Sequence, residues 1–346
     1  MYIDIDTTTL LQKSVFVMHD FFIDRILSVE YSSWEDRLVH MIREKMRVGG
    51  GSIRGIKQHD TKGGNATNLA YALGRFNAKC TLVTLADEYG SALLKSTFLG
   101  MDNVNVIVLR GRQGYTLALE FRGEDGRVAN VMLSDIGDNA CFGSDRLNGL
   151  EYLLSGASCI AVVNWASNTK GSELIEYVFD NNNNNGLHFL DPADISERRE
   201  EFAKMLLSRS FRLDVLSINE NEARVLASTM GIECMPNNYS VEDVVKQCKS
   251  IASTLDTRVD IHTPLCSASS DGRDVSYAEG VRVDARISTG AGDVWDAMDI
   301  IGYLLEMDAT ERLSLANIAA AYYVSNARVP KPEELYSWMR NHTAWY

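Results

Sequence analysis

Strand and helix signals alternate along most of this 346-residue sequence, and the alternation constrains its fold more than any other feature. Short apolar runs, typical of fully buried strands, occupy residues 79–85, 104–109 and 159–164. Helical patterns separate such runs, for example at residues 65–76 and 88–98. Alternating strands and helices are typical of a mainly parallel sheet covered by helices. The sequence therefore predicts an α/β fold.

Two stretches interrupt this alternation. Residues 116–121 and 127–132 flank the turn 122–126, which contains two glycines and predicts a β-hairpin. The segment 25–61 contains a helical pattern at residues 34–46, followed by three consecutive glycines. Both stretches are either surface excursions or parts of one accessory element beside the core.

No repeat or linker divides the chain, so residues 1–346 are expected to form a single domain. The asparagine-rich tract at 181–186 has low complexity and lies between a helical pattern and a strand pattern. We interpret it as a surface loop without a function.

Composition narrows the classes of partner. The formal net charge of −13 argues against a nucleic-acid-binding surface, which usually carries a basic stripe. The amino-terminal residues lack the basic region of a signal peptide, and no apolar run reaches membrane-spanning length. The six cysteines contain no Cys-X-X-Cys pair and lie mostly in apolar surroundings, so we expect reduced, buried thiols. These features predict a cytoplasmic protein without a nucleic-acid or membrane partner.

Residues 289–293 read Thr-Gly-Ala-Gly-Asp and open a helical pattern whose apolar face contains Trp295, Met298, Ile301 and Leu305. The N–H groups and the dipole at a helix N-terminus favour an anion and can stabilise charge on a transferring phosphoryl group. Asp293 falls in the same turn, where we expect it to be ionised at neutral pH and able to accept a proton from a hydroxyl. This combination predicts phosphoryl transfer, although the run alone also fits an ordinary strand-to-helix turn.

A second run, Gly63-Gly64-Asn65-Ala66-Thr67-Asn68, favours the first interpretation. Together the two runs resemble the paired signatures of the ribokinase-like (PfkB-type) carbohydrate kinases. Two further elements occur in the same order as in that family: Asn219 and Glu222 resemble its Asn-X-X-Glu element, and Asn317 lies in a stretch that resembles its late Ala/Asn-rich helix.

The resemblance implies a function for each matching residue. The expected sugar-binding residues are Asp24, Gly63, Gly64, Asn68 and Asn164. Asp293 would be the general base, and Gly290, Ala291 and Gly292 the anion hole. The expected nucleotide-binding residues are Thr289, Asn219, Glu222 and Asn317, and the resemblance implies that Asn219 and Glu222 hold Mg²⁺ through water. Without the resemblance, Asn219 and Glu222 would be interpreted as a helix cap.

The resemblance also implies a ribokinase-like three-layer α/β/α core with a mainly parallel sheet and a small lid, formed by residues of about 25–61 and 113–131. The expected reaction is ATP- and Mg²⁺-dependent phosphorylation of a sugar hydroxyl, with a homodimer formed through the lid as a further expectation. A nucleoside acceptor and a non-catalytic sugar or nucleotide sensor are the alternatives. Lys57, Lys62, Arg54 and Arg122 of the lid either bind a phosphorylated sugar or are simply solvated.

The sequence departs from the family pattern at several places, among them Ile287, which stands where the family usually has Asp, and the polar Asp296. Residues 261–266 lack the family's Thr-X-Gly turn, which leaves the nucleotide donor open, and Trp295 replaces the usual Phe. There is no Gly-Lys-Ser/Thr run, and the third glycine of a dinucleotide fingerprint is missing, so those two nucleotide sites are excluded. Of the scattered histidines, His19 and His262 end apparent strands, where parallel sheets place their ligands.

Overall fold

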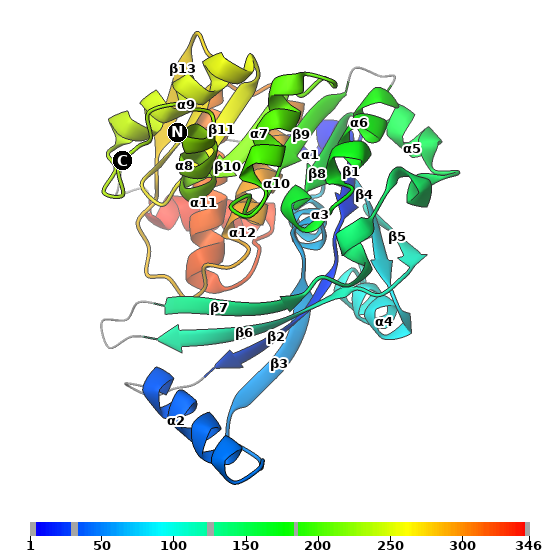
Figure 1. Cartoon of the computed structure of the whole chain (residues 1–346). Helices are drawn as coiled ribbons and strands as arrows, with labels where there is room; N and C mark the ends of the chain where they lie inside the picture. The colour runs from blue at the N-terminus through cyan, green and yellow to red at the C-terminus, as the bar shows by residue number, and fades with distance from the viewer. Residues whose placement is uncertain (1–4, 29–33, 123–127, 183–185, 343–346) are drawn as a thin grey trace.

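The computed structural model describes residues 5–28, 34–122, 128–182 and 186–342. Within these residues, a nine-stranded sheet has the strand order β13-β12-β11-β10-β9-β8-β1-β4-β5 (Figure 1). Its strands are β1 Ser14–His19, β4 Lys79–Ala86, β5 Val104–Arg110, β8 Cys159–Val163, β9 Leu187–Asp191, β10 Val215–Asn219, β11 Arg258–His262, β12 Cys266–Ser270 and β13 Val275–Glu279. All neighbouring strands pair in parallel except β11–β12 and β12–β13, which are antiparallel.

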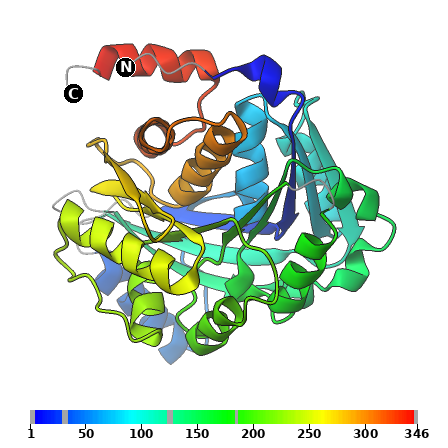
Figure 2. The same ribbon diagram turned by 90° about the horizontal axis from the view of Figure 1, so that it is seen from above.

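Helices cover both faces of this sheet, which confirms the three-layer α/β/α core (Figure 2). One face is covered by α3 Asn65–Arg75, α10 Ala291–Leu304 and α11 Ala309–Asn326. The other is covered by α6 Gly171–Asp180, α7 Arg199–Ser208, α8 Glu220–Thr229 and α9 Val241–Leu255. The remaining described helices are α1 Thr7–Leu10, α2 Trp34–Arg47, α4 Glu88–Thr97, α5 Glu151–Ser155, α12 Pro332–His342 and the short 3₁₀ helices Gly137–Cys141, Ser144–Leu147 and Trp165–Ser167. None of the described helices combines the length and apolar character needed to cross a bilayer.

A second sheet of four strands, in the order β3-β2-β6-β7, extends from one edge of the core in the described part of the chain (Figure 1). Its strands are β2 Phe22–Ser28, β3 Lys57–Gly63, β6 Gly114–Arg122 and β7 Val128–Asp135. The two segments expected to form a lid contribute most of this sheet, and the expected helix at 34–46 is α2, between β2 and β3. Residues 123–127 of the expected hairpin turn and 183–185 of the asparagine tract lie outside the described residues.

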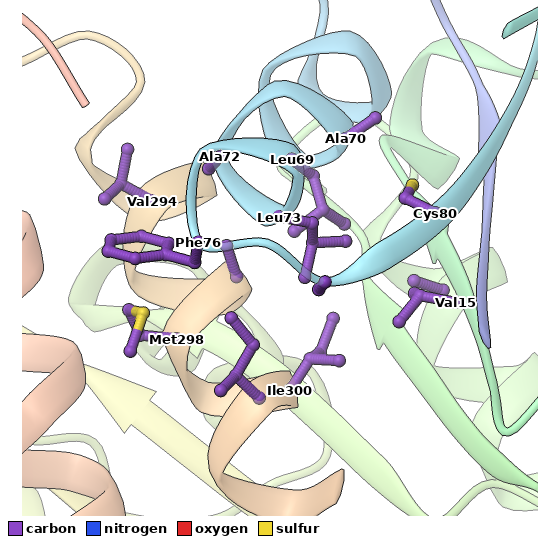
Figure 3. Packing of buried hydrophobic residues seen from close by; sticks show 14 of the residues in the cluster. Val15, Leu69, Ala70, Ala72, Leu73, Phe76, Cys80, Val294, Met298 and Ile300 are labelled. Atoms are coloured by element: carbon purple, nitrogen blue, oxygen red, sulfur yellow. The ribbon is translucent and has the colours of Figure 1, made fainter. Parts of the chain in front are cut away.

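Helix α10 is buried almost all round, whereas the sequence pattern predicts one apolar face. It packs between α3 and α11, and Figure 3 shows Phe76, directly after α3, beside Val294 and Met298 of α10. As a result Asp293, Asp296 and Asp299, which a surface helix would direct to solvent, lie in the interior. The expected buried thiols occur at Cys80, Cys159, Cys248 and Cys266, while Cys141 and Cys234 are exposed; all six are free.

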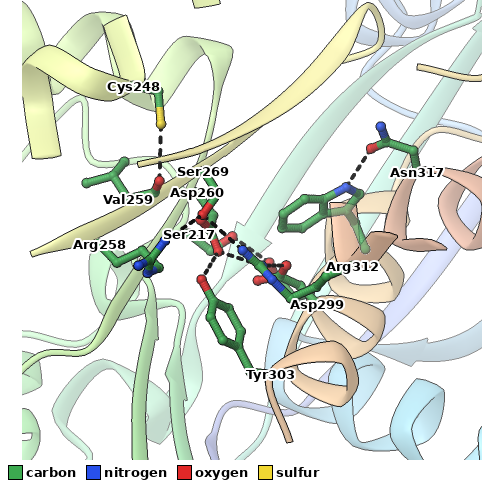
Figure 4. Close-up of polar contacts among 12 residues, drawn as sticks. Ser217, Cys248, Arg258, Val259, Asp260, Ser269, Asp299, Tyr303, Arg312 and Asn317 are labelled. Carbon is green, nitrogen blue, oxygen red and sulfur yellow. Dashed lines mark hydrogen bonds and ion pairs between the residues drawn. The ribbon is translucent and has the colours of Figure 1, made fainter. Parts of the chain in front are cut away.

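A buried ionic network ties α10 and α11 to the sheet (Figure 4). The Arg312 guanidinium pairs with Asp260 at 2.9 Å and with Asp299, and donates to the Ser269 hydroxyl. The Tyr303 hydroxyl donates to Asp260 at 2.7 Å. Because a buried charge is costly without partners, this network holds the carboxyl-terminal helices in a defined position.

Candidate active site

The carboxyl ends of the parallel strands meet at one edge of the large sheet, where polar side chains gather. Asp191, Asn219 and His262 end β9, β10 and β11, and Asp20 and Asn164 directly follow β1 and β8. In open α/β sheets, ligands bind outside this edge. The first residues of α3 and α10 are joined at the same edge by hydrogen bonds between Asn65, Asn68 and Asp293.

The two glycines of the 289–293 run differ in their structural roles. Gly290 caps α10 in the left-handed region, with φ +85°, and a Cβ there would lie 2.8 Å from the Tyr323 hydroxyl. Gly292 lies in the first helical turn, where a Cβ would only contact the His262 ring at 3.4 Å. The Ala291 N–H donates to the Ser288 carbonyl at 3.2 Å, so that amide is already engaged in a turn. Only Gly290 is therefore required by the backbone itself.

The Asp293 carboxylate is held by two asparagines of α3. Asn65 Nδ2 donates to Oδ1 at 3.0 Å, and Asn68 Nδ2 donates to Oδ2 at 2.9 Å. Asp293 is 5% exposed. The double-glycine run and the 289–293 run, more than 200 residues apart in sequence, thus form one site.

Burial opposes the expectation that Asp293 is ionised because it lies near a helix N-terminus. The pKa of Asp293 is raised to about 8, mainly by burial. The negative charges of Asp191 and Asp20 also raise this pKa, whereas the hydrogen bond from Asn68 and the charge of Lys62 lower it by less. Desolvation outweighs the helix dipole here because the dipole contributes at most about 2 kcal/mol.

Asp24 lies on β2 against the double glycine. A side chain at Gly63 would overlap the Asp24 carboxylate, which explains the glycine at this position. Burial raises the pKa of Asp24 to about 6, and a hydrogen bond with Thr116 opposes the shift. Gly64 has φ +90°, and a Cβ there would lie 2.9 Å from the Asp20 carbonyl oxygen.

Asp20 is a site residue that the sequence patterns did not single out. Its carboxylate accepts hydrogen bonds from the N–H groups of Asn65 (3.0 Å) and Ala66 (2.8 Å), and so caps α3. It also accepts from Nδ2 of Asn164 at 2.8 Å, so this expected substrate-binding side chain is engaged within the protein. The sequence did contain a signal for Asp20: it is an acidic residue directly after the buried strand β1, where parallel sheets bind their ligands.

Asn219 and Glu222 form a capping box at the start of α8. Asn219 Oδ1 accepts from the N–H groups of Asn221 and Glu222, and both Glu222 oxygens accept from Asn219. Burial, followed by the charge of Asp191, raises the pKa of Glu222 to about 8. Both residues border an open cavity of about 530 Å³ that is also lined by Asp194 and Arg224.

Asp191 and Asp296 form a second pair that sequence patterns missed. Burial raises the pKa of both carboxyls, and their proximity favours a shared proton. Asp296 Oδ1 also accepts from the Ser217 hydroxyl at 2.6 Å. Asp191 also raises the pKa of both Glu222 and Asp293, so it couples the carboxyl groups of α8 and α10 electrostatically.

Asn317 ties α10 to the end of β13, and the Thr289 carbonyl anchors the loop before α10. Asn317 Oδ1 accepts from Nε1 of Trp295 at 2.8 Å (Figure 4), and its Nδ2 donates to the carbonyls of Ala278 and Glu279. The Thr289 carbonyl accepts from the Tyr323 hydroxyl at 2.9 Å. His262 stacks on Trp295, and burial lowers its pKa to about 4, so it is neutral.

No protein-family model and no curated protein sequence matches this chain. Solved structures do match: ribokinase from Thermotoga maritima has a TM-score of 0.69 at 18% identity, covering 95% of this chain and 99% of that one. Adenosine kinase from Sinorhizobium meliloti has a TM-score of 0.71 at 15% identity, covering 95% and 98%. Ribokinase from Cryptococcus neoformans, solved in complex with ADP, has a TM-score of 0.66 at 15% identity, covering 94% and 99%.

Proposed function

Because the chain has the fold of the ribokinase-like kinases, we propose that it transfers the γ-phosphoryl group of ATP to a hydroxyl of a sugar or sugar derivative. The observation that carries this proposal is the Asp293 carboxylate, held by Asn65 and Asn68 at the N-terminus of α10. A general base beside a helix N-terminus joins proton acceptance with stabilisation of the phosphoryl charge.

In this mechanism Asp24, Gly64 and Asn68 position the acceptor so that its hydroxyl donates a proton to Asp293. The Gly290–Gly292 turn lies at the N-terminus of α10, where the positive end of the helix dipole stabilises the charge on the transferring phosphoryl group. The second sheet closes over the acceptor and excludes water. Phosphoryl transfer depends mainly on such positioning and charge stabilisation.

The residues around Asn219 and Glu222 fit Mg²⁺ held through water. Their donors are oxygens, and the carboxyl groups of Asp191, Asp194 and Glu222 repel one another in a way that a divalent cation would relieve. Within the described residues no three His, Cys, Asp or Glu side chains are arranged to ligate a metal directly. Bound Mg²⁺ would neutralise phosphate charge, and Thr289 and Asn317 would support the nucleotide side.

The charge around the acceptor position favours an uncharged acceptor. Asp20 and Asp24 supply neighbouring carboxyl groups, and the Lys62 ammonium already donates to Asn68. On the lid face that carries Asp24, the strand register places Thr61, Thr116 and Ser134 beside it, and these are hydroxyl groups. A phosphate or carboxylate on the acceptor would face net repulsion here.

A nucleoside acceptor is the second candidate. On the same lid face, the register places Ile26, Ala118 and Met132 in the next row after Asp24, Thr116 and Ser134. Such an apolar row can cover a nucleobase while Asp24 binds ribose hydroxyls.

The test is ADP release measured with neutral pentoses and hexoses, their phosphates, and nucleosides, with Asp293→Asn as the control. We expect release with a neutral sugar or nucleoside and none with the matched phosphate. Binding of sugar and nucleotide by calorimetry without ADP release from any acceptor would instead support a non-catalytic sensor.

The outer lid face supports the homodimer. Leu117, Leu119, Val131 and Leu133 share that face, and Val131 and Leu133 are 45% and 57% exposed. A second copy of the chain would cover this apolar surface. Leu133→Asp should then halve the mass measured by light scattering, whereas a monomeric native chain would contradict this assembly.

A further inference from the structure

Lys62 is the penultimate residue of β3, directly before Gly63, and extends into the site. Its Nζ donates a hydrogen bond to Asn68 Oδ1 and lies 4.7 Å from the centroid of the Tyr71 ring. The side chain is half-buried. It interacts electrostatically with Asp293 and with Asp24.

The contact with Lys62 determines which way the Asn68 amide faces. An ammonium group only donates hydrogen bonds, so it requires Oδ1 on its side of the amide. Nδ2 must then face Asp293, to which it donates at 2.9 Å. The reversed amide would place one oxygen against the Asp293 carboxylate, and Lys62 would lose its acceptor.

Among the described groups that interact with Asp293, Lys62 is the one with a positive charge. Asp191 of β9, Asp20 after β1 and Asp296 of the same helix are acidic. Tyr323 of α11 and Asp24 of β2 add no positive charge, and His262 of β11, beside Gly292, is neutral. Removing Lys62 would leave these carboxyl groups without a balancing charge.

We propose that Lys62 is a positioning residue for the proposed phosphoryl transfer: it orients the Asp293 carboxylate through Asn68 and supplies the positive charge that balances it. This inference rests on the proposed function. Burial lowers the pKa of Lys62 to about 8 and raises that of Asp293, while the charge of each group opposes the shift of the other. The ammonium–carboxylate form of the pair is the one that can accept the acceptor's proton.

The experiment compares Lys62→Met, which removes the charge and the donor, with Lys62→Gln, which keeps a donor, and Lys62→Arg, which keeps the charge. Lys57→Met is the matched control, because Lys57 is an exposed lysine on the same strand. Turnover is measured from pH 6 to 10 with saturating ATP and acceptor.

We expect Lys62→Met to lower turnover at pH 7 tenfold or more and to move the acidic limb of the pH profile upward by about one unit or more, the usual effect of losing an opposite charge at short range. The KM for ATP should change less than twofold. Lys62→Arg should restore most of the profile, Lys62→Gln should keep the displaced limb, and Lys57→Met should match the native protein. A loss of turnover that is equal at every pH, or no loss, would overturn the proposal.

A second measurement needs no substrate, and therefore separates this inference from the proposed function. In protein carrying ¹³C at the aspartate Cγ, the Asp293 resonance is identified by its loss in Asp293→Asn. It should titrate at higher pH in Lys62→Met than in the native chain. An unchanged or lower titration point refutes the role of Lys62 even if no acceptor is ever found. If Lys62→Met does not fold, the same comparison with Lys62→Gln decides.

Discussion

Replacing Asp293 with asparagine should inactivate the protein and also change the pH dependence of its stability. The pKa of Asp293 rises from its ordinary value of 3.8 to about 8 in the folded chain. Below pH 3.8 the group is protonated in both states. Between 3.8 and 8 the unfolded chain loses the proton while the folded chain keeps it, so rising pH favours unfolding, and above 8 the cost is constant.

The size of the effect follows from that shift. Each pH unit costs about 1.4 kcal/mol, so three units between pH 5 and pH 8 cost about 4 kcal/mol. Asparagine does not titrate, but it leaves one of the donors on Asn65 and Asn68 without its oxygen, at a pH-independent cost of about 1–3 kcal/mol. Asp293→Asn should therefore gain about 4 kcal/mol relative to the native chain between pH 5 and pH 9, whatever the constant term.

Urea unfolding of both proteins at pH 5, 7 and 9 measures this difference, and ADP release measures activity. Turnover should fall by roughly 10²–10⁴, the range for loss of a general base, while ATP binding persists. The exposed Asp102→Asn is the control and should change neither property. A stability difference that does not grow with pH would refute the buried, protonated Asp293, and near-normal turnover would refute its role as the base.

Three further perturbations test the site and its support. Gly290→Ala should lower the free energy of unfolding in urea by about 1 kcal/mol or more, because of the positive φ at Gly290, and should displace Tyr323. Gly292→Ala should keep the native stability, whereas Gly292→Val should weaken ATP binding measured by calorimetry. Equal stability losses for the alanine variants at 290 and 292 would contradict the geometry. Asp24→Ala and Asn68→Ala should raise the KM for the acceptor far more than that for ATP, and a change confined to the ATP curve would place the acceptor elsewhere. Arg312→Met should lower the free energy of unfolding by about 3–5 kcal/mol, because it leaves Asp260 and Asp299 buried without their cation. The control is Arg258→Met, at a more exposed ion pair, which should lower it by under about 1 kcal/mol. Similar losses for both variants would contradict the role of the buried network.

The elements that follow from local pattern were predictable from the sequence. The strands at 79–86, 104–110 and 159–163 and the helices α3 and α4 lie within a residue of their expected bounds, because apolar runs and helical periodicity report backbone pairing and burial directly. Gly64 and Gly290 are required by the backbone at the start of two helices, and such local requirements are visible in a short run. The pairing of the two glycine runs across the fold followed from their family resemblance.

The chemistry of the site was decided only by tertiary structure. Asp20, Asp191, Lys62 and Tyr323 reach Asp293 from four separate segments, and no spacing in the sequence relates them. The protonation of Asp293 depends on how completely α3, α10 and α11 exclude water from it, and on which charges remain nearby. Desolvation and Coulomb energy depend on distance in space, whereas helix and strand patterns depend on distance along the chain. The sequence therefore determined that a carboxylate would lie in the first turn of a helix, and packing determined whether that carboxylate carries its proton.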